Sequence, residues 1–177
     1  TIMRTAAQSA LELCDGEQMD IAFPYKTATE ESYFGKIGKK SASLFRASAY
    51  CGALAGGGTP LEVQSLSTFG EDFGIAYQLM DDLRDLTSSE EQVPKDLKTA
   101  RLKLPLIHLY EMSDSDGRGQ LESDLRSIFG GERRSSLKAV RRIKRMLRES
   151  GSIDYCKKRI AEYVQRSIDS LEPLKDN

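Results

Sequence analysis

Apolar residues recur every three to four positions along most of this chain, which predicts helices, and no segment shows the strict alternation of a strand. A turn around Pro24, the glycines at 56–58, the run SDSDGRG at 113–119 and Gly151 interrupt the pattern. The predicted helices cover residues 2–20, 30–55, a long segment from Pro60 through the aspartates near 85, 101–112, 119–129, 133–149 and 152–171. We therefore predict an all-α fold with long helices.

The long third helix has the clearest start signal. Three glycines end the preceding helix, and Thr59 can cap a helix whose first position is Pro60. At about 100° per residue, with Gln78 at zero, Asp82 lies near 40°, Asp85 near 340° and Asp81 near 300°. These polar residues therefore share one face. The opposite arc is apolar and predicts a packed back, formed by Phe73, Ile75, Leu79, Met80, Leu83 and Leu86.

Carboxylates three and four residues apart on a helix repel one another, so a counter-charge is expected. Arg84 lies about 160° from Asp82 on the helix and cannot neutralise the cluster. Magnesium can do so, since it takes oxygen ligands and is usually held by one or two carboxylates together with waters and substrate phosphates. The alternative is a solvated acidic face, which is the commoner explanation of a DDxxD pattern taken alone. The flanking residues reverse that preference in favour of a magnesium and diphosphate site.

The residues around these aspartates resemble a known motif. Residues 69–85 read FGEDFGIAYQLMDDLRD, which is similar to the second aspartate-rich motif FGxxxGxxxQxxDDxxD of the trans-prenyl diphosphate synthases. The matching positions are Phe69, Gly70, Gly74, Gln78, Asp81, Asp82 and Asp85. In this resemblance Gly74 leaves space either for an allylic group or for a neighbouring helix.

Other segments resemble the same family in the same order. GEQMD at 16–20 is similar to G(Q/E)xxD, and residues 33–45 are similar to Y-x6-K-T-x2-L-F, with Lys40 as the lysine and Ser41 in place of threonine. Lys26 also precedes a threonine, but it lacks the flanking residues. Residues 94–107 resemble GKxxGxDLxxGKxTLPLI, in which Lys95 and Arg101 stand for the lysines. The run from 151 to 174 resembles the family's last helix.

The resemblance implies the C-terminal part of the isoprenoid synthase helical fold, with long helices around a central diphosphate and prenyl cavity. It implies a prenyltransferase that condenses isopentenyl diphosphate with an allylic prenyl diphosphate, with magnesium as cofactor, in a homodimer. By the same resemblance Asp81, Asp82 and Asp85 hold the metal. Lys40 and Ser41 bind diphosphate, and Gln78 orients it or stabilises the carbocation. Lys95 and Arg101 also contact diphosphate.

The family's first aspartate-rich motif is absent from this sequence, so we interpret residues 1–177 as a single domain that forms the C-terminal portion of a longer protein. We expect this portion alone to be inactive. The alternative function is a non-catalytic partner subunit of a heteromeric prenyl diphosphate synthase, although such subunits often have eroded aspartate motifs and DDLRD is intact.

Composition adds few constraints. The 26 basic and 27 acidic residues give a net charge of −1, which indicates neither nucleic acid nor a membrane as partner. Residues 132–148 form a third possibility, a basic binding module, but Leu137, Val140, Ile143 and Leu147 make a solvated amphipathic helix the favoured interpretation. The three cysteines predict buried, reduced thiols in a cytoplasmic protein. No run is long enough to predict a transmembrane segment.

Overall fold

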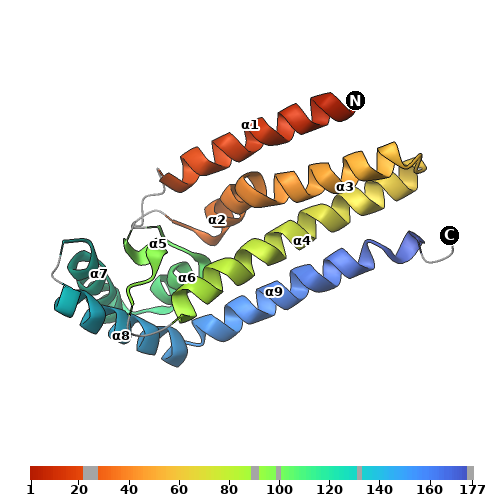
Figure 1. Ribbon diagram of the computed structural model, residues 1–177. Coiled ribbons are helices and arrows are strands. Elements are labelled where there is room, and N and C mark those ends of the chain that lie inside the picture. The colour runs from red at the N-terminus through yellow and green to blue at the C-terminus, as the bar shows by residue number, and fades with distance from the viewer. Residues whose placement is uncertain (22–27, 89–91, 99–100, 131–132, 175–177) are drawn as a thin grey trace. The chain divides into compact units, whose positions relative to one another are not determined.

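The computed structural model describes residues 1–21, 28–88, 92–98, 101–130 and 133–174, and every regular element among them is helical (Figure 1). The all-α prediction is therefore confirmed. The elements are α1 (Ile2–Ile21), α2 (Glu30–Ile37), a π-helical segment (Gly38–Ala42), α3 (Ser43–Ala55), α4 (Pro60–Thr87), α5 (Lys95–Lys98), α6 (Leu104–Met112), α7 (Ser115–Gly130), α8 (Arg133–Glu149), α9 (Ser152–Asp169) and a final 3-10 turn (Glu172–Leu174).

The predicted start of α4 is confirmed. The Thr59 hydroxyl accepts a hydrogen bond from the Glu62 amide at 3.3 Å, and the Glu62 carboxylate accepts one from the Thr59 amide at 2.6 Å, which is a capping box. Before it, Gly57 has a φ of +78°, and the amides of Gly57 and Gly58 close back onto α3. The glycine run thus ends one helix just before Thr59 begins the next.

Two predicted boundaries were wrong. Residues 113–119 were expected to form a loop, yet α7 begins at Ser115 because the Asp114 carboxylate accepts a hydrogen bond from the Gly117 amide at 2.8 Å and caps the helix. Residues 101–103 were expected to be helical, yet α6 begins at Leu104, with Pro105 in its first turn. The turn predicted around Pro24 lies outside the described residues.

The described chain falls into two compact units. Unit 1 comprises the described residues of Thr1–Ala22, Phe34–Leu79 and Lys158–Asn177, and unit 2 those of Phe23–Tyr33 and Met80–Lys157. In unit 1, a Cβ on Gly74 would lie 2.7 Å from the Ala42 Cα and 3.0 Å from the Phe45 ring. Of the two roles considered for Gly74, close helix packing is therefore the one that the structure supports.

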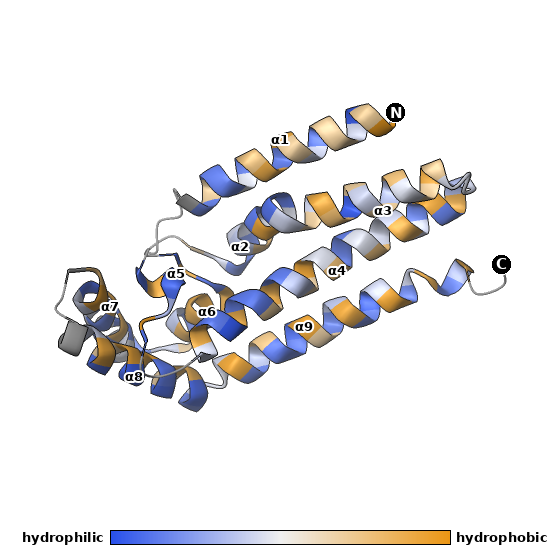
Figure 2. Cartoon of the chain, in the orientation of Figure 1, coloured by the Kyte–Doolittle hydropathy of each residue, from blue (hydrophilic) through white to orange (hydrophobic). Residues whose placement is uncertain are grey.

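Unit 2 has an apolar core built from α6, α7 and α8. On α8, Val140, Ile143 and Leu147 of the predicted stripe are buried and Leu137 is half-buried, and Figure 2 shows apolar and polar residues alternating along this helix. Arg142 points its guanidinium at the buried carboxylate of Asp124. This basic helix therefore packs as an amphipathic helix, with one of its arginines used inside the unit.

The predicted apolar back of α4 is only partly correct. Leu79, Leu83 and Leu86 are buried, whereas Phe73 and Met80 are 40% and 44% exposed. The expectation of three buried thiols was likewise wrong, because Cys156 is buried but Cys14 is exposed. Among the described residues, no helix is long and apolar enough to span a bilayer.

Candidate functional site

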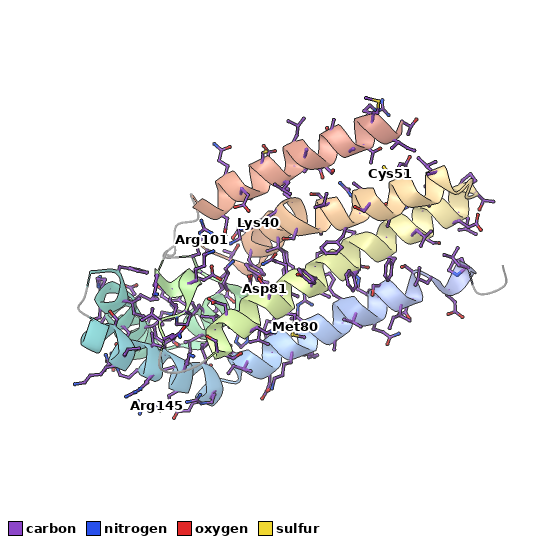
Figure 3. The ribbon with its side chains drawn as sticks, viewed as in Figure 1. Lys40, Cys51, Met80, Asp81, Arg101 and Arg145 are labelled. Carbon is purple, nitrogen blue, oxygen red and sulfur yellow. The ribbon has the colours of Figure 1, made fainter. Side chains whose placement is uncertain are left out.

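The predicted diphosphate-binding residues Lys40 and Ser41 lie in the π-helical segment. Figure 3 labels Lys40 there. Backbone angles on both sides stay helical, with φ/ψ of −70°/−28° at Ile37 and −56°/−39° at Ser43. The helical run from 30 to 55 is therefore continuous but contains a widened turn that sequence periodicity did not predict. Such π segments are rare and frequently mark functional sites.

Unit 1 holds Lys40 with acidic residues from the end of α1. The Lys40 ammonium lies 2.8 Å from the Asp20 carboxylate and 3.2 Å from that of Glu17. Gly16 makes this possible, because a Cβ there would lie 2.3 Å from the Lys40 backbone nitrogen. The GEQMD segment thus has a clear structural role, since its glycine lets α1 approach and its two acids orient the lysine.

Asp20 is the anchor of this cluster. Its side chain is fully buried, and its other carboxylate oxygen lies 2.8 Å from the fully buried ammonium of Lys36. Glu17, in contrast, is 46% exposed. A buried carboxylate shared by two ammonium groups fixes their positions, whereas an exposed one can give way to a more highly charged anion. Lys40 is therefore oriented yet remains 18% exposed.

The structure also brings together two other predicted residues. The Ser41 hydroxyl donates a hydrogen bond to the Gln78 side-chain oxygen at 2.5 Å. Both side chains are partly buried, and both belong to unit 1. The serine that replaces the family's threonine thus uses its hydroxyl to orient the glutamine of the aspartate helix.

The three predicted metal ligands belong to unit 2 and have different environments. Asp81 is exposed. Asp82 is buried, with one oxygen accepting a hydrogen bond from the Tyr33 hydroxyl at 2.5 Å and the other lying 3.1 Å from the Lys103 ammonium. Asp85 accepts hydrogen bonds from the backbone amides of Lys95 and Asp96. The helix places these residues on one face as predicted, but their partners differ.

Lys103 is a site residue that sequence reasoning missed. Its side chain is only 4% exposed, and its ammonium also lies 3.6 Å from the Asp96 carboxylate. Lys103 therefore gives Asp82 a counter-charge from within the chain, where the sequence pattern predicted magnesium. A helical wheel compares only residues of one helix, such as Arg84, and Lys103 lies outside the aspartate helix. One signal was present, because Lys103 stands where the motif GKxTLPLI has threonine.

Burial is the main cause of two raised pKa values in unit 2. It raises the pKa of Tyr33 well above its usual value, and the negative charge of Asp82 adds to the effect, so Tyr33 remains a hydrogen-bond donor. Burial also raises the pKa of the Cys156 thiol to about 12, with smaller contributions from Glu30 and Asp82.

Within the described ranges, no group of three or more His, Cys, Asp or Glu side chains is arranged to hold a metal ion. The donor chemistry nevertheless suits magnesium, which needs only one or two carboxylates besides waters and phosphate. Asp81 offers such oxygens at an exposed position, and Asp85 offers them at a half-buried one, where each oxygen accepts a hydrogen bond from a backbone amide. Asp82 is buried, with its two oxygens held by Tyr33 and Lys103. A metal role for the aspartates stays a prediction.

Three lysine and arginine positions considered in the sequence analysis remain. Lys95 is exposed at the start of α5, and the Arg101 amide donates to the Asp96 carbonyl at 3.0 Å. Lys26 lies outside the described residues.

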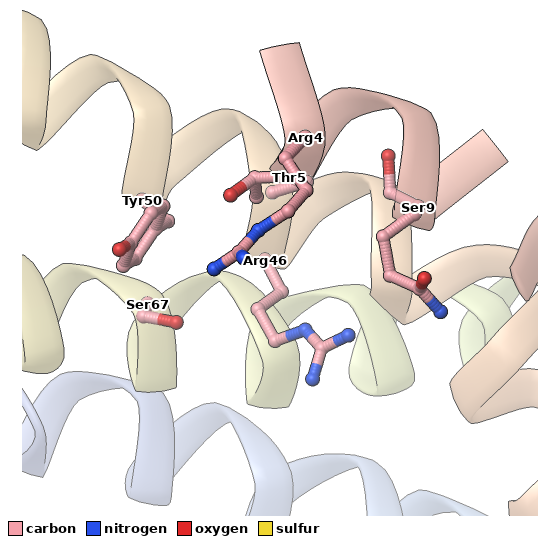
Figure 4. Close-up of a pocket in the computed structure, with 8 residues that line it drawn as sticks. Arg4, Thr5, Ser9, Arg46, Tyr50 and Ser67 are labelled. Carbon is pink, nitrogen blue, oxygen red and sulfur yellow. The ribbon is translucent and has the colours of Figure 1, made fainter. Parts of the chain in front are cut away.

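Unit 1 also contains a cavity of about 330 Å³ that includes none of the predicted site residues (Figure 4). Its lining residues are Arg4, Thr5, Gln8, Ser9, Arg46, Ala47, Tyr50 and Ser67.

Solved structures place this helical arrangement among the polyprenyl synthases. A polyprenyl synthase from Roseobacter denitrificans matches with a TM-score of 0.85 and 23% identity over 98% of this chain and 56% of its own. A geranylgeranyl pyrophosphate synthetase from Pyrococcus horikoshii Ot3 matches with a TM-score of 0.81 and 28% identity over 96% of this chain and 51% of its own. The fold is therefore the all-α isoprenoid synthase fold.

Sequence comparison gives the family. The Polyprenyl synthetase family profile matches residues 1–146. The geranylgeranyl diphosphate synthase of Methanosarcina mazei is 32% identical over 180 residues, which cover 98% of this chain and 52% of that protein. The octaprenyl diphosphate synthase of Escherichia coli K12 is 32% identical over 152 residues, or 84% and 45%. The chain belongs to the polyprenyl synthetase family, and it spans about half the length of these relatives.

Proposed function

We propose that this chain acts as part of a prenyl diphosphate synthase, which joins isopentenyl diphosphate to an allylic prenyl diphosphate. The observation that carries the proposal is the local organisation of the predicted residues. Lys40 is oriented by Asp20 and Glu17, and Ser41 is hydrogen-bonded to Gln78. Family membership and the names of the relatives support the same reaction class.

In the proposed reaction the allylic carbon–oxygen bond breaks, and its electron pair leaves with the diphosphate. The double bond of isopentenyl diphosphate then attacks the allylic carbocation, and loss of a proton yields a chain five carbons longer. Magnesium bound at the aspartates would disperse the negative charge of the leaving group. Cationic side chains aimed at the same charge lower the barrier further.

The chain's own residues have distinct roles in this proposal. Lys40 donates to diphosphate oxygens when its ammonium turns from the exposed Glu17, while the buried Asp20 holds its position. Gln78, fixed by Ser41, orients the allylic diphosphate or stabilises the carbocation. Lys95 and Arg101 supply further positive charge for diphosphate. Magnesium dependence, a homodimeric state, a cytoplasmic location and inactivity of residues 1–177 alone also belong to the proposal.

Replacement of Asp81 and Asp82 by alanine tests the proposal in the intact protein. Turnover of allylic diphosphate at saturating magnesium should fall by at least two orders of magnitude, because the leaving-group charge would no longer be offset. A wild-type rate for this double variant would contradict the assignment. A wild-type protein that is inactive alone but activates a second prenyl synthase chain would favour the non-catalytic partner subunit.

A further inference from the structure

The Lys103 side chain contacts the aspartate motif, although Lys103 lies outside that motif in the sequence. Its ammonium lies 3.1 Å from Asp82 and 3.6 Å from Asp96, and the exposed fractions of the three side chains are 4%, 3% and 15%. Tyr33 donates to the other oxygen of Asp82 at 2.5 Å. All four residues belong to unit 2.

The neighbouring aspartates, Asp81 and Asp85, have surroundings that differ from those of Asp82. Asp81 is exposed, and among the described residues it forms no ion pair and no side-chain hydrogen bond. Asp85 is half-buried and accepts only backbone amides, which leave its negative charge unneutralised. Charge compensation within the motif is therefore unequal, and it is concentrated on Asp82.

We propose that Lys103 is the built-in counter-ion of Asp82 and that it removes Asp82 from the ligands available to a divalent cation, leaving Asp81 and Asp85 as the metal carboxylates. A cation at Asp82 would have to enter a buried position beside an ammonium that repels it. Two carboxylates are enough for magnesium when phosphate and water complete the octahedron. The metal part of this inference rests on the proposed function.

The same contacts give Asp82 and Lys103 a positioning role. Lys103 joins Asp82 on α4 to Asp96 on α5, and the Asp96 amide in turn donates to Asp85 at 3.2 Å. These contacts hold α5, and with it Lys95, beside the aspartates within unit 2. Removal of either partner of the ion pair leaves the other charge buried, which destabilises the fold.

Manganese binding provides the test, because Mn²⁺ substitutes for magnesium and its free form is measured by electron paramagnetic resonance. The intact protein is titrated with Mn²⁺ in the presence of inorganic pyrophosphate. Asp81→Asn should weaken the affinity at least tenfold, whereas Asp82→Asn should change it less than threefold. Lys103→Met should strengthen it at least tenfold, because it frees Asp82. Lys138→Met, on the exposed face of α8, is the matched control and should have no effect.

Thermal unfolding of the metal-free protein separates a folding defect from a binding effect. Asp82→Asn and Lys103→Met should each lower Tm, and the double variant should recover most of the loss because it buries no unpaired charge. If Lys103→Met does not fold, the double variant and Asp82→Asn still report on metal affinity.

The counter-ion role is overturned if Asp82→Asn weakens Mn²⁺ binding as much as Asp81→Asn does. It is also overturned if the Lys103→Met protein binds Mn²⁺ with the affinity of the wild type. Failure of the proposed function has a different signature. In that case Asp81→Asn binds Mn²⁺ as tightly as the wild type, whatever happens at Lys103.

Discussion

Replacement of Gly16 by alanine should disrupt the packing that orients Lys40. The new Cβ would lie 2.3 Å from the Lys40 nitrogen, 2.5 Å from its Cα and 2.8 Å from its Cβ. Ordinary contact begins at about 3.4 Å, so α1 and the π-helical segment must separate by about 1 Å. The atoms that collide are mostly backbone, which cannot rotate out of the way.

Two opposing effects determine how much Gly16→Ala changes the free energy of unfolding. Overpacking costs about 1–3 kcal/mol, and the rigid backbone places this site near 3 kcal/mol. Alanine gains about 1 kcal/mol over glycine inside a helix. The free energy of unfolding should therefore fall by about 2 kcal/mol. Lys40 should also bind diphosphate more weakly, because its contacts with Asp20 and Glu17 depend on this close approach.

Gly52→Ala is the matched control for Gly16→Ala. Gly52 is an exposed helical glycine of α3, and a Cβ there would meet nothing within 4 Å. This substitution should raise the free energy of unfolding by about 1 kcal/mol. Urea unfolding followed by far-ultraviolet circular dichroism measures both variants. A Gly16→Ala protein at least as stable as the wild type would refute the steric argument.

Two further predictions concern Lys40 and Cys156. Lys40→Ala should lower turnover by about two to three orders of magnitude, since a contact to leaving-group charge is worth about 2–4 kcal/mol, while Lys26→Ala should cost little; the reverse ranking in steady-state kinetics would contradict the assignment. Native Cys156 should resist a thiol reagent such as DTNB at pH 8 while Cys14 reacts, because burial raises the pKa of the Cys156 thiol to about 12. The folded state retains the thiol proton that the unfolded state loses near the ordinary pKa of 9.0. The free energy of unfolding should therefore fall as pH rises from 9.0 towards 12, and Cys156→Ala should remove this part of its pH dependence.

Strong local signals made much of the fold predictable. The helix start at Thr59 and Pro60 and the apolar stripe of α8 depend on a few neighbouring residues, so the sequence predicted both. The start of α7 was missed because Ser and Asp favour loops and helix caps alike. The π-helical segment leaves no mark on periodicity, since it adds only one residue to a turn.

Sequence motifs nominated Lys40, Ser41 and Gln78 for the candidate site. Their roles stay predictions, and the structure adds the contacts that orient them. The ion pair of Lys103 with Asp82 was not predicted, because it joins α4 to the extended residue before α6, and only the folded chain brings these together. Helical-wheel geometry places side chains on a face but says nothing of what packs against it.

Incorporation of radiolabelled isopentenyl diphosphate tests the central claim most directly. The intact protein is incubated with magnesium, the labelled substrate and an allylic partner such as geranyl or farnesyl diphosphate, and the products are separated by chain length. We predict label in prenyl diphosphates longer than the allylic substrate by multiples of five carbons, with none formed by the variant that carries alanine at Asp81 and Asp82. Absence of elongated product from the intact wild-type protein, or equal product from that variant, would contradict the proposed function.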